Sequence, residues 1–465
     1  MEYNKKIITD LENLKGKKVI LRCDFNVPIK KETGKISDYT RIDAALKTIN
    51  YLLDKGVKLV VLSHLSRIKT LDDINSGKKS LAIVAEALKG RLPGKTIVFE
   101  KDNRDKGLAK KIDEMAEGSL MLLENTRYAD INEKGELVKL ESKNSPELGK
   151  FWASLGDIFV NDAFGTCHRA HASNAGIAKN IKESAIGFLV NEELSKLSKA
   201  VVNPQKPVVA IFGGAKVSDK VPSIKNIGKF ADKILIGGGM AFIFLKAQGY
   251  EIGKSLYEAE QLELTKELLK EFGSKIILPI DAICASNIKD VKGKNYKMDS
   301  FPKDLAGFDI GKKSVKLFKK NLKDAKTIIW NGPLGVFEND AFNKGTLKIC
   351  KTIAKLTSKG CYSVIGGGDS AAAAAKCGVT HLFSHISTGG GASLEFFSGV
   401  ELPGVACIQD KGAIAADVKP TITKKEETTT KKPVAKTSST TAAKKTTTVK
   451  KDAAKPVAKK TTSKK

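Results

Sequence analysis

The chain has 465 residues, of which 41% are hydrophobic, and carries a formal net charge of +28 at neutral pH. A chain of this size can bury a full core and form two or three domains. The first residues show no apolar run behind their positive charges, and no later stretch approaches the roughly 18 apolar residues of a membrane-spanning helix. Seven scattered cysteines, never spaced as C-x-x-C, argue against a disulfide framework or a zinc site. We therefore expect a cytoplasmic protein without a transmembrane segment.

The positive charge is unevenly distributed along the chain. Residues 419–465 contain fifteen lysines and three acidic residues, and consist almost entirely of Lys, Thr, Ala, Ser, Pro and Val. Such a segment buries too little apolar surface to offset its conformational entropy, so we expect a disordered basic tail. The tail is either a solvated appendage or a nonspecific binding arm for nucleic acid or anionic surfaces. The rest of the chain is also basic, which suits phosphorylated metabolites and nucleic acid alike.

Short apolar runs alternate with longer amphipathic stretches through residues 1–186. Runs of successive apolar residues, such as those within 17–25 and 57–65, are typical of parallel strands covered on both faces. The same alternation restarts in 204–396, after a polar helical stretch at 187–203 that is followed by two prolines. The sequence therefore predicts an α/β fold with two Rossmann-like lobes, each a mainly parallel sheet flanked by helices, joined by an interdomain helix.

Arginine is rare in this chain, since 73 of the 80 basic residues are lysine. Five of the seven arginines follow apolar runs or begin a helix in the first lobe: Arg22, Arg41, Arg67, Arg127 and Arg169. In a parallel sheet these positions gather at the carboxyl ends of strands, where ligands bind. A planar guanidinium grips carboxylate or phosphate through two hydrogen bonds, which an ammonium cannot do. We expect a basic cup for a small, multiply charged anion; the alternative is a set of structural salt bridges.

Other residues of the first lobe are given simpler interpretations. Arg91 and Arg104 lie in polar stretches and are expected on the surface. His64, His168 and His171 accompany the arginines along the sequence, but no nearby motif supplies the further ligands that a metal site would need. We therefore interpret these histidines as supporting residues.

The second lobe repeats one pattern, in which an apolar strand leads into glycines and then into a helix. It occurs at 211–220, 235–242 and 364–376, and three glycines open a further helix within 387–397. Glycine lets a backbone approach a ligand closely, and a helix N-terminus offers unpaired N–H groups to phosphate. Glycines can also simply form tight turns, but four such motifs favour a nucleotide site. Neither a Walker-type loop nor a dinucleotide fingerprint is present, which disfavours an NAD-dependent enzyme.

Four polar residues of the second lobe suit a nucleotide. Lys216 and Lys220 lie where a phosphate loop needs lysine, and their spacing puts both on one face if the segment is helical. In a lysine-rich chain such a pair also arises by chance. Asp369 follows three glycines and precedes an alanine-rich stretch, so it is either a helix N-cap, the slightly favoured interpretation, or a Mg²⁺ ligand. Glu338 is an acceptor of the kind that a ribose diol needs.

These motifs occur together in the order seen in the phosphoglycerate kinase family, which the chain resembles over residues 1 to about 415. The motifs are RCDFNVP, HLSR, LLENTRY, NDAFGTCHRAH, GGAKVSDK, IGGGMAF, WNGPLGVFE, GGGDS and STGGGASLE. The resemblance implies a glycolytic enzyme that moves a phosphoryl group reversibly between 1,3-bisphosphoglycerate and ADP, giving 3-phosphoglycerate and ATP. It places 3-phosphoglycerate in the domain 1–186 and Mg²⁺ with ATP or ADP in the domain 204–396. It also implies that 397–418 returns to the first domain.

The resemblance further implies which residues form each site. The triose would be bound by Arg22, Asp24, Asn26, Arg41, His64, Arg67, Arg127 and Arg169. The nucleotide would be bound by Gly213, Gly214, Lys216, Lys220, Gly237, Gly238, Gly307, Asn331, Glu338, Gly367, Gly368, Asp369 and Ser370. The transferring phosphoryl group would be contacted by Arg41, Lys216, Lys220 and the helix start at Gly389, Gly390 and Gly391, with Asp369 on the metal. The chain departs from the family pattern at Ser66, where glycine is usual, at Ile68, where proline is usual, and at Ser370, which replaces threonine.

The implied reaction explains why the sequence offers no general base. The attacking carboxylate is already ionised at neutral pH, so catalysis depends on alignment and on cations and N–H dipoles placed around the transferring group. Because donor and acceptor occupy separate lobes, we expect the lobes of a monomer to close about 187–203. Nucleic-acid binding by the body is the competing hypothesis. An aromatic content of only 6% and the glycine motifs disfavour it.

Overall fold

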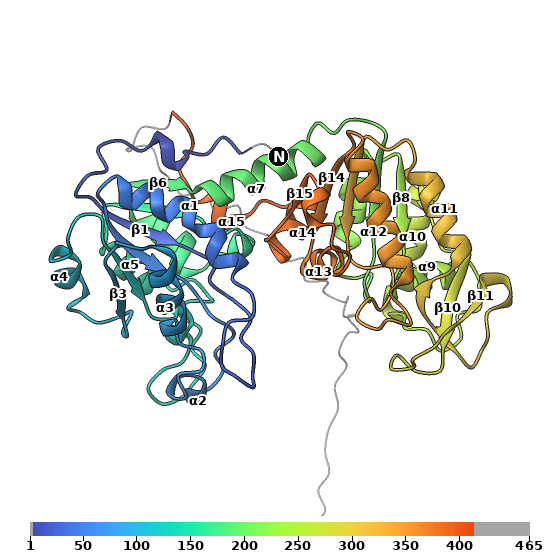
Figure 1. Cartoon of the computed structure of the whole chain (residues 1–465), viewed down its shortest axis with the longest axis horizontal. Helices are drawn as coiled ribbons and strands as arrows, with labels where there is room; N and C mark the ends of the chain where they lie inside the picture. Colours follow the sequence, from blue (N-terminus) through green and yellow to red (C-terminus); the bar gives the residue numbers. More distant parts are fainter. Residues whose placement is uncertain (1–2, 413–465) are drawn as a thin grey trace, which may run out of the picture. The chain divides into compact units, whose positions relative to one another are not determined.

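The structure, a computed structural model, describes residues 3–412 of the chain. It contains two separate six-stranded sheets, and all neighbouring strands within each are parallel (Figure 1). The predicted α/β fold with two mainly parallel sheets is confirmed. The predicted tail at 419–465 and the last residues of the predicted returning segment, 413–418, lie outside the described residues.

The first sheet has the strand order β3-β4-β2-β1-β5-β6. Its strands are β1 (Lys18–Arg22), β2 (Lys58–Leu62), β3 (Ile97–Glu100), β4 (Leu120–Leu123), β5 (Ile158–Asn161) and β6 (Glu183–Ile186). Its helices are α1 (Thr40–Asp54), α2 (Leu71–Asn75), α3 (Ala82–Arg91), α4 (Leu108–Asp113), α5 (Pro146–Ala153) and α6 (Ile177–Asn180). Helices α1 and α3 pack on one face of the sheet, and α4 and α5 on the other, so the central strands are buried on both sides, as continuous apolar runs predict. Because β4, β2, β1 and β5 are neighbours, the loops that follow them share one edge.

The second sheet has the order β15-β14-β13-β7-β8-β9. Its strands are β7 (Val208–Phe212), β8 (Lys233–Ile236), β9 (Ile276–Ile277), β13 (Thr327–Asn331), β14 (Tyr362–Gly366) and β15 (His385–Ile386). The helices of this half are α8 (Val221–Gly228), α9 (Ala241–Ala247), α10 (Leu262–Phe272), α11 (Lys312–Leu322), α12 (Lys344–Thr357), α13 (Gly368–Lys376) and α14 (Gly391–Phe397). Apolar side chains of α11, α12 and α13 cover one face, and those of α8 and α10 cover the other.

A small antiparallel sheet, which the sequence analysis did not anticipate, adjoins the second sheet. It has the order β11-β10-β12, with β10 (Asp281–Ala285), β11 (Lys294–Lys297) and β12 (Ala306–Ile310). It packs on α9, and Gly307 of β12 faces Phe242 so closely that a Cβ there would lie 2.1 Å from the ring. Glycine is therefore required at this position by packing.

Helix α7 (Phe188–Val201) links the segments that form the two six-stranded sheets. It begins after Gly187, where a Cβ would lie 2.3 Å from the carboxyl carbon of Asp162, so only glycine fits. Near the other end of the described chain, α15 (Pro403–Ala406) and its flanks contact the first sheet. Asn161 donates to the carbonyl of Gly404 at 2.6 Å. No helix within residues 3–412 is long and apolar enough to cross a membrane.

Candidate active site

The loops at the carboxyl edge of the first sheet carry the arginines that the sequence singled out. Arg22 is the last residue of β1, and Arg67, Arg127 and Arg169 follow β2, β4 and β5. Arg41 lies in the first turn of α1, which starts at Thr40. Electrostatic coupling among Arg22, Arg127 and Arg169 indicates that these three lie near one another. The structure therefore gathers these arginines at one sheet edge, as the sequence predicted.

Arg22 differs from the other arginines because it is completely buried. Its Nε donates to the hydroxyl of Ser173 at 2.8 Å, another of its nitrogens bonds the carbonyl of Cys23, and a third lies 3.3 Å from Nδ1 of His64. The carboxylate of Glu141, also fully buried, lies 4.0 Å away. Burial raises the pKa of Glu141, and the Arg22 charge opposes that shift. Arg22 thus lies beneath the surface of the edge and bonds to protein groups.

Arg41 reaches back from α1 to the loop after β1. Its guanidinium forms an ion pair with the carboxylate of Asp24, which is largely buried. The other oxygen of Asp24 accepts from the backbone N–H of Asn26 at 3.2 Å. A Cβ at Gly165 would lie 2.3 Å from the same Asp24 carboxylate, so the loop after β5 passes directly against this pair. The ion pair leaves Arg41 one-third exposed, with donors still able to reach a ligand.

Ser66, one of the departures from the family pattern, adopts a left-handed backbone conformation. Its φ is +59°, the region that glycine enters without steric cost and other residues rarely adopt. Its N–H donates to the side chain of Asn26 at 2.8 Å, and its carbonyl accepts from Arg127 at 2.7 Å. Serine therefore keeps the loop shape that the usual glycine would give, held by bonds to two predicted site residues. Arg67, the next residue, is exposed, and Ile68, where proline is usual, is buried.

The three histidines of this edge are held in their neutral form. Burial, with Arg22, Arg127 and Arg41 nearby, holds the pKa of His64 well below its usual range. Burial and neighbouring arginines lower the pKa of His171 to about 3, and burial and Arg169 lower that of His168 to about 4. Burial is the largest cause of the lowered pKa in all three histidines, and neighbouring positive charge adds to it. The edge is thus electropositive before any ligand arrives.

Glycine loops form the carboxyl edge of the second sheet, but they serve two different purposes. At Gly213 a Cβ would lie 2.1 Å from the carbonyl oxygen of Pro333, and at Gly237 it would lie 2.6 Å from Leu334. A Cβ at Gly238, whose φ is +66°, would lie 2.7 Å from the backbone of Gly214. These glycines let the loops after β7, β8 and β13 pack against one another, which is the tight-turn alternative.

Other glycines of the same edge face open space. A Cβ at Gly214, Gly368 or Gly390 would meet no atom within 4 Å. Gly214 and Gly390 also have positive φ values, of +103° and +50°. At Gly367, where φ is +95°, a Cβ would lie 3.3 Å from Asn331. The open positions leave backbone accessible beside the starts of α13 and α14, as phosphate binding requires.

The two lysines near Gly214 do not lie on a common helix. Residues after Gly214 form turns, and α8 starts only at Val221, so the condition for placing Lys216 and Lys220 on one helical face is not met. Lys216 is exposed, whereas Lys220 precedes α8 and bonds the side-chain oxygen of Asn331. Burial lowers the pKa of Lys220, and the charges of Asp219 and Asp369 oppose that shift. Lys220, Asn331 and Asp369 are therefore neighbours, although their strands differ.

The favoured interpretation of Asp369 as a helix cap is wrong. The N-cap of α13 is Gly367, which has a positive φ, and no side chain caps this helix. The helix therefore starts two residues earlier than an Asp369 cap would place it. Asp369 lies in the first turn with an exposed carboxylate. Its neighbour Ser370 is buried, and its hydroxyl accepts from the N–H of Gly332 at 2.6 Å, a bond that ties α13 to the loop after β13. Glu338 is exposed on that loop.

The glycines at the start of α14 lie against the loop after β5. A Cβ at Gly389 would lie 2.3 Å from the ring of Phe164, and one at Gly391 would lie 3.0 Å from Nε2 of His168. The preceding Thr388 donates through its N–H and its hydroxyl to the buried carboxylate of Glu193 in α7, at 2.7 and 2.8 Å. The α14 start therefore contacts the segment between His168 and the first sheet's strand β5.

Sequence reasoning missed two acidic residues that organise these edges. Glu141 accepts from the N–H and hydroxyl of Ser173 and lies 3.8 Å from Nδ1 of His171, and Glu193 bonds Thr388 and His385. Both carboxylates are fully buried. Glu141 lies in a polar stretch with no apolar periodicity, so nothing local marked it. Glu193 shares the buried side of α7 with Leu197 and Val190, and a charged residue on an apolar helical face was the signal available.

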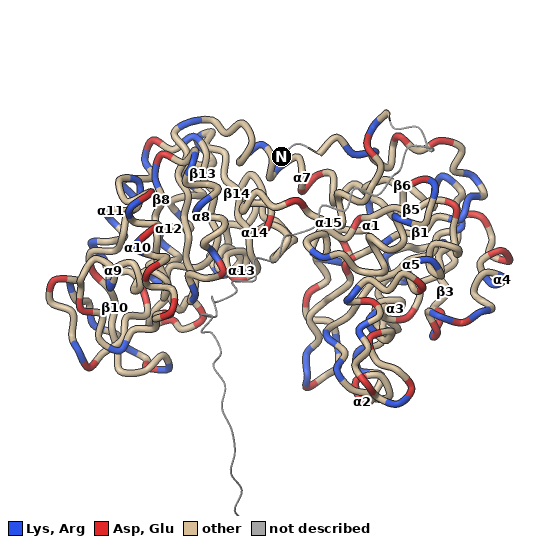
Figure 2. Tube along the Cα trace, turned by 180° about the vertical axis from the view of Figure 1, so that it is seen from behind, with Lys and Arg blue, Asp and Glu red and all other residues tan. Residues whose placement is uncertain are grey.

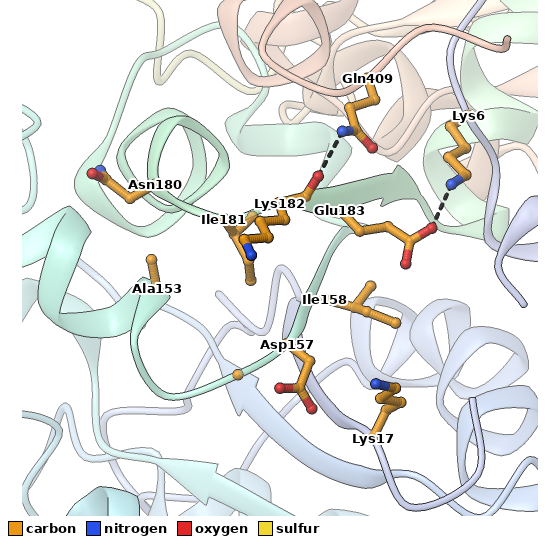
Figure 3. A pocket seen from close by; sticks show the side chains of 11 residues that line it. Lys6, Lys17, Ala153, Asp157, Ile158, Asn180, Ile181, Lys182, Glu183 and Gln409 are labelled. Carbon is orange, nitrogen blue, oxygen red and sulfur yellow. Dashed lines mark hydrogen bonds and ion pairs between the residues drawn. The ribbon is translucent and has the colours of Figure 1, made fainter. Parts of the chain in front are cut away.

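A cavity of about 560 Å³ lies away from both edges (Figure 3). Its lining includes Lys6, Asp157, Ile158, Glu183 and Gln409, at the amino ends of β5 and β6. Lys6 pairs with Glu183 there. Because the arginines and glycine loops follow the carboxyl ends of their strands, this cavity is separate from the candidate site.

A parallel sheet with an arginine-rich carboxyl edge, together with a second sheet whose glycine loops leave helix starts open, is typical of α/β enzymes that act on phosphorylated small molecules. The family model of phosphoglycerate kinase matches residues 8–400. The chain belongs to the phosphoglycerate kinase family.

Curated relatives and solved structures agree with this assignment. The chain is 82% identical over 413 residues to the phosphoglycerate kinase of Malacoplasma penetrans, covering 89% of this chain and 88% of that protein. It is 53% identical to that of Listeria monocytogenes, covering 88% of this chain and all of the relative. The phosphoglycerate kinase structure from Coxiella burnetii aligns with a TM-score of 0.74 at 38% identity, covering 87% of this chain and 98% of that one. The phosphoglycerate kinase structure from Pyrococcus horikoshii aligns with a TM-score of 0.72 at 30% identity, covering 86% of this chain and 98% of that one.

The family establishes the reaction. The enzyme transfers a phosphoryl group reversibly between 1,3-bisphosphoglycerate and ADP, yielding 3-phosphoglycerate and ATP, as a step of glycolysis. The expected kinase activity is confirmed, and the NAD-dependent alternative is wrong.

Proposed function

We propose that the carboxyl edge of the first sheet binds the triose. The binding groups are Asp24, Asn26, Arg41, His64, Arg67, Arg127 and Arg169, with Arg22 acting from below. Arg67 and Arg169 are exposed and Arg127 is partly exposed, so each can present a guanidinium fork to phosphate or carboxylate. Arg22 is completely buried, so its contribution is to hold His64 neutral and to add positive potential.

We propose that the glycine-lined edge binds ATP or ADP. Lys216, Lys220 and Asn331 would face the phosphates, with Gly214, Gly367 and Gly368 offering backbone N–H groups and Glu338 an acceptor for the ribose. Gly213, Gly237, Gly238 and Gly307 contribute through packing, since a Cβ at each would collide with neighbouring loops or Phe242. Ser370 contributes through its bond to Gly332, which positions the start of α13.

We propose Asp369 as the protein ligand of Mg²⁺. No group of three or more His, Cys, Asp or Glu residues within residues 3–412 is arranged to hold a metal. A single exposed carboxylate at the start of a helix nevertheless fits Mg²⁺, which is commonly held by one or two carboxylates together with substrate phosphates. When bound with the nucleotide, the ion would neutralise charge on the phosphate oxygens.

Catalysis then rests on positioning. The substrate carboxylate is ionised at neutral pH, so no protein base needs to accept a proton. Arg41, Lys216 and Lys220, with the N–H groups at Gly389, Gly390 and Gly391, would place positive charge around the phosphoryl group as it passes between oxygens. Arg41 is already oriented by Asp24, which reduces the entropy lost when the substrate binds.

We also propose a domain organisation and an oligomeric state for the chain. The domains would be 1–186, 204–396 and the returning segment 397–418, with 187–203 as the connecting helix about which they close. Contacts of Asn161 with Gly404 and of Ser184 with Gln409 support the return. A single chain carries both edges, which supports a monomer, and the seven free cysteines suit the reducing cytoplasm. The role of the tail at 419–465, appendage or binding arm, stays a prediction.

The observation that carries this assignment is the contrast between exposed arginines on one edge and open glycines on the other. A crossed kinetic experiment tests it, in the coupled assay of ATP consumption with 3-phosphoglycerate and Mg²⁺ against a blank without acceptor. Arg169→Met should raise the KM for 3-phosphoglycerate at least tenfold and leave that for ATP within twofold. Asp369→Asn should raise the KM for ATP at least tenfold and leave that for 3-phosphoglycerate within twofold. It should also raise the Mg²⁺ concentration needed for half-maximal activity. Arg104→Lys, on the exposed surface, serves as the control. Equal effects of both substitutions on both KM values would refute the division.

A further inference from the structure

Helices α11 and α12 pack side by side on one face of the second sheet and turn a strongly basic surface outward. Their inward residues, such as Phe318 and Ile353, are buried in the core. The exposed lysines of these helices and the residues just after them are Lys312, Lys313, Lys316, Lys319, Lys320, Lys323, Lys344, Lys348, Lys351, Lys355 and Lys359. Figure 2 colours the lysines of both helices blue. We call this set the lysine face.

The lysine face has little compensating negative charge; among its members, Lys348 interacts electrostatically with the buried Asp309. Within the described chain, none of its eleven ammonium groups forms an ion pair or a hydrogen bond. Asp324 is the one acidic residue in 312–326, and 344–359 contains none. Some surface lysines elsewhere are paired: Lys89 with Glu86 at 2.7 Å, and Lys95 with Asp54 at 2.7 Å. The lysine face is distinguished by its density, with eleven exposed lysines and a single acidic residue on two adjacent helices and the residues just after them.

The arrangement of this charge is unfavourable for the isolated protein. Lys312, Lys316 and Lys320 of α11 follow one another at four-residue spacing, as do Lys351 and Lys355 of α12. Like charges at this spacing on a helix repel and weaken it. A polyanion laid across the two helices would convert this repulsion into attraction and release its own counterions.

We propose that the lysine face binds the phosphate backbone of duplex DNA without sequence preference. No large hydrophobic side chain of α11 or α12 is exposed, so the face has nothing to insert into a bilayer and no aromatic ring on which single-stranded bases could stack. Lysine contacts phosphate as a point charge and reads no base. Helices α11 and α12 are in contact, and contacting helices generally pack with their axes about 8–10 Å apart. The major groove of B-form DNA is about 12 Å wide, so long lysine side chains on two adjacent helices suit phosphates on both sides of that groove.

Matched charge variants of the full chain test the proposal. The face variant changes Lys312, Lys316, Lys320, Lys348, Lys351 and Lys355 to Gln. The control variant makes the same change at six surface lysines that have acidic partners: Lys15, Lys89, Lys95, Lys110, Lys206 and Lys266. Both variants keep the basic tail and the same net charge. Binding to a 30-base-pair DNA duplex is measured by fluorescence anisotropy from 50 to 200 mM salt, with kinase activity and thermal unfolding as checks of folding.

The face variant should bind DNA at least tenfold more weakly at 50 mM salt, with unchanged kinase turnover. The slope of log K against log salt should fall by about 0.9 for each DNA phosphate that the variant no longer neutralises. The control variant should stay within twofold of the unaltered protein. Equal losses of affinity in both variants, or no loss in either, would overturn the proposal and assign DNA retention to the tail or to net charge. Tighter binding of the unaltered protein to duplex RNA, whose major groove is narrow, or to vesicles with anionic lipids would overturn the two-row geometry.

Discussion

The carboxyl edges of the two six-stranded sheets present opposite solutions to binding an anion. The first edge uses side chains: five arginines approach one region, and carboxylates of Asp24 and Glu141 accompany two of them. The second edge uses backbone: glycines remove side chains so that loops can pack and helix starts stay open. Guanidinium groups recognise a small anion from several directions, whereas a backbone cradle suits the row of phosphates in a nucleotide.

The difference extends to what each edge requires for stability. Charges crowded on the first edge must be compensated, so a buried carboxylate accompanies the buried Arg22. The second edge instead depends on the absence of Cβ atoms where loops meet. Substitutions should therefore distinguish residues that stabilise an edge from residues that contact the ligand. On the first edge, stability should be lost when a buried charge loses its partner. On the second edge, it should be lost when a Cβ is added where loops meet.

The largest effect is expected from removing the buried cation of the first edge. Arg22→Met leaves the carboxylate of Glu141 buried without its main charged neighbour, which should lower the free energy of unfolding by about 3 kcal/mol. Urea unfolding followed by circular dichroism measures this decrease. The double variant Arg22→Met with Glu141→Gln should recover at least half of it. A single variant as stable as the unaltered protein would show that Arg22 is not a supporting residue.

Adding a single methyl group at the second edge should destabilise the protein. Gly213→Ala places a Cβ 2.1 Å from the carbonyl oxygen of Pro333, so backbone must move, and the free energy of unfolding should fall by about 2 kcal/mol. Gly368→Ala is the matched control, because its Cβ meets no atom within 4 Å. It should leave stability within about 0.5 kcal/mol but raise the KM for ATP, since it narrows the approach to α13. A stable Gly213→Ala protein would contradict the packing role.

The fork of Arg41 should matter more than its charge. Arg41→Lys keeps a cation near Asp24 but cannot offer two parallel donors, so turnover should fall at least tenfold, which corresponds to at least about 1.4 kcal/mol of barrier. Steady-state kinetics in both directions measures the effect, with Arg104→Lys as the control. Near-normal turnover would show that the fork is unimportant.

The sequence predicted which residues lie at each edge better than it predicted the contacts that these residues make. Apolar runs located the strands, and parallel topology then placed the residues following β1, β2, β4 and β5 on one edge. The burial of Arg22 could not be predicted, because its partners Ser173 and Glu141 are more than a hundred residues away in the chain. The same holds for the glycines, since the identical residue type packs against Pro333 at Gly213 and faces open space at Gly368.

Local conformation explains one unmet condition and one error at the second edge. Lys216 and Lys220 share a face only if the segment after Gly214 is helical, but this segment forms turns until Val221, and the N–H of Gly214 instead bonds the carbonyl of Pro333 in the loop after β13. Asp369 was favoured as a cap, but a positive φ at Gly367 moves the helix start. Both differences occur beside glycines with positive φ, Gly214 and Gly367, and the glycine residue type permits a wide range of torsion angles and therefore does not specify one.

The smallest effect concerns His171, which burial and the crowded charges of the first edge keep neutral. Burial and nearby arginines lower the pKa of His171 to about 3, so between pH 6.5 and 3 the unfolded chain takes up a proton that the folded chain does not. This histidine therefore contributes stability above pH 6.5 that is lost as the pH falls. Replacing it by His171→Gln should make stability fall less steeply, by about 1 kcal/mol between pH 6 and pH 5. Urea unfolding at the two pH values measures the slope, and His381→Gln, on an exposed turn, should leave it unchanged. An equal slope with and without His171 would show that burial and the positive potential of the edge do not keep this histidine neutral, and the contrast between the edges would then rest on the arginines' geometry alone.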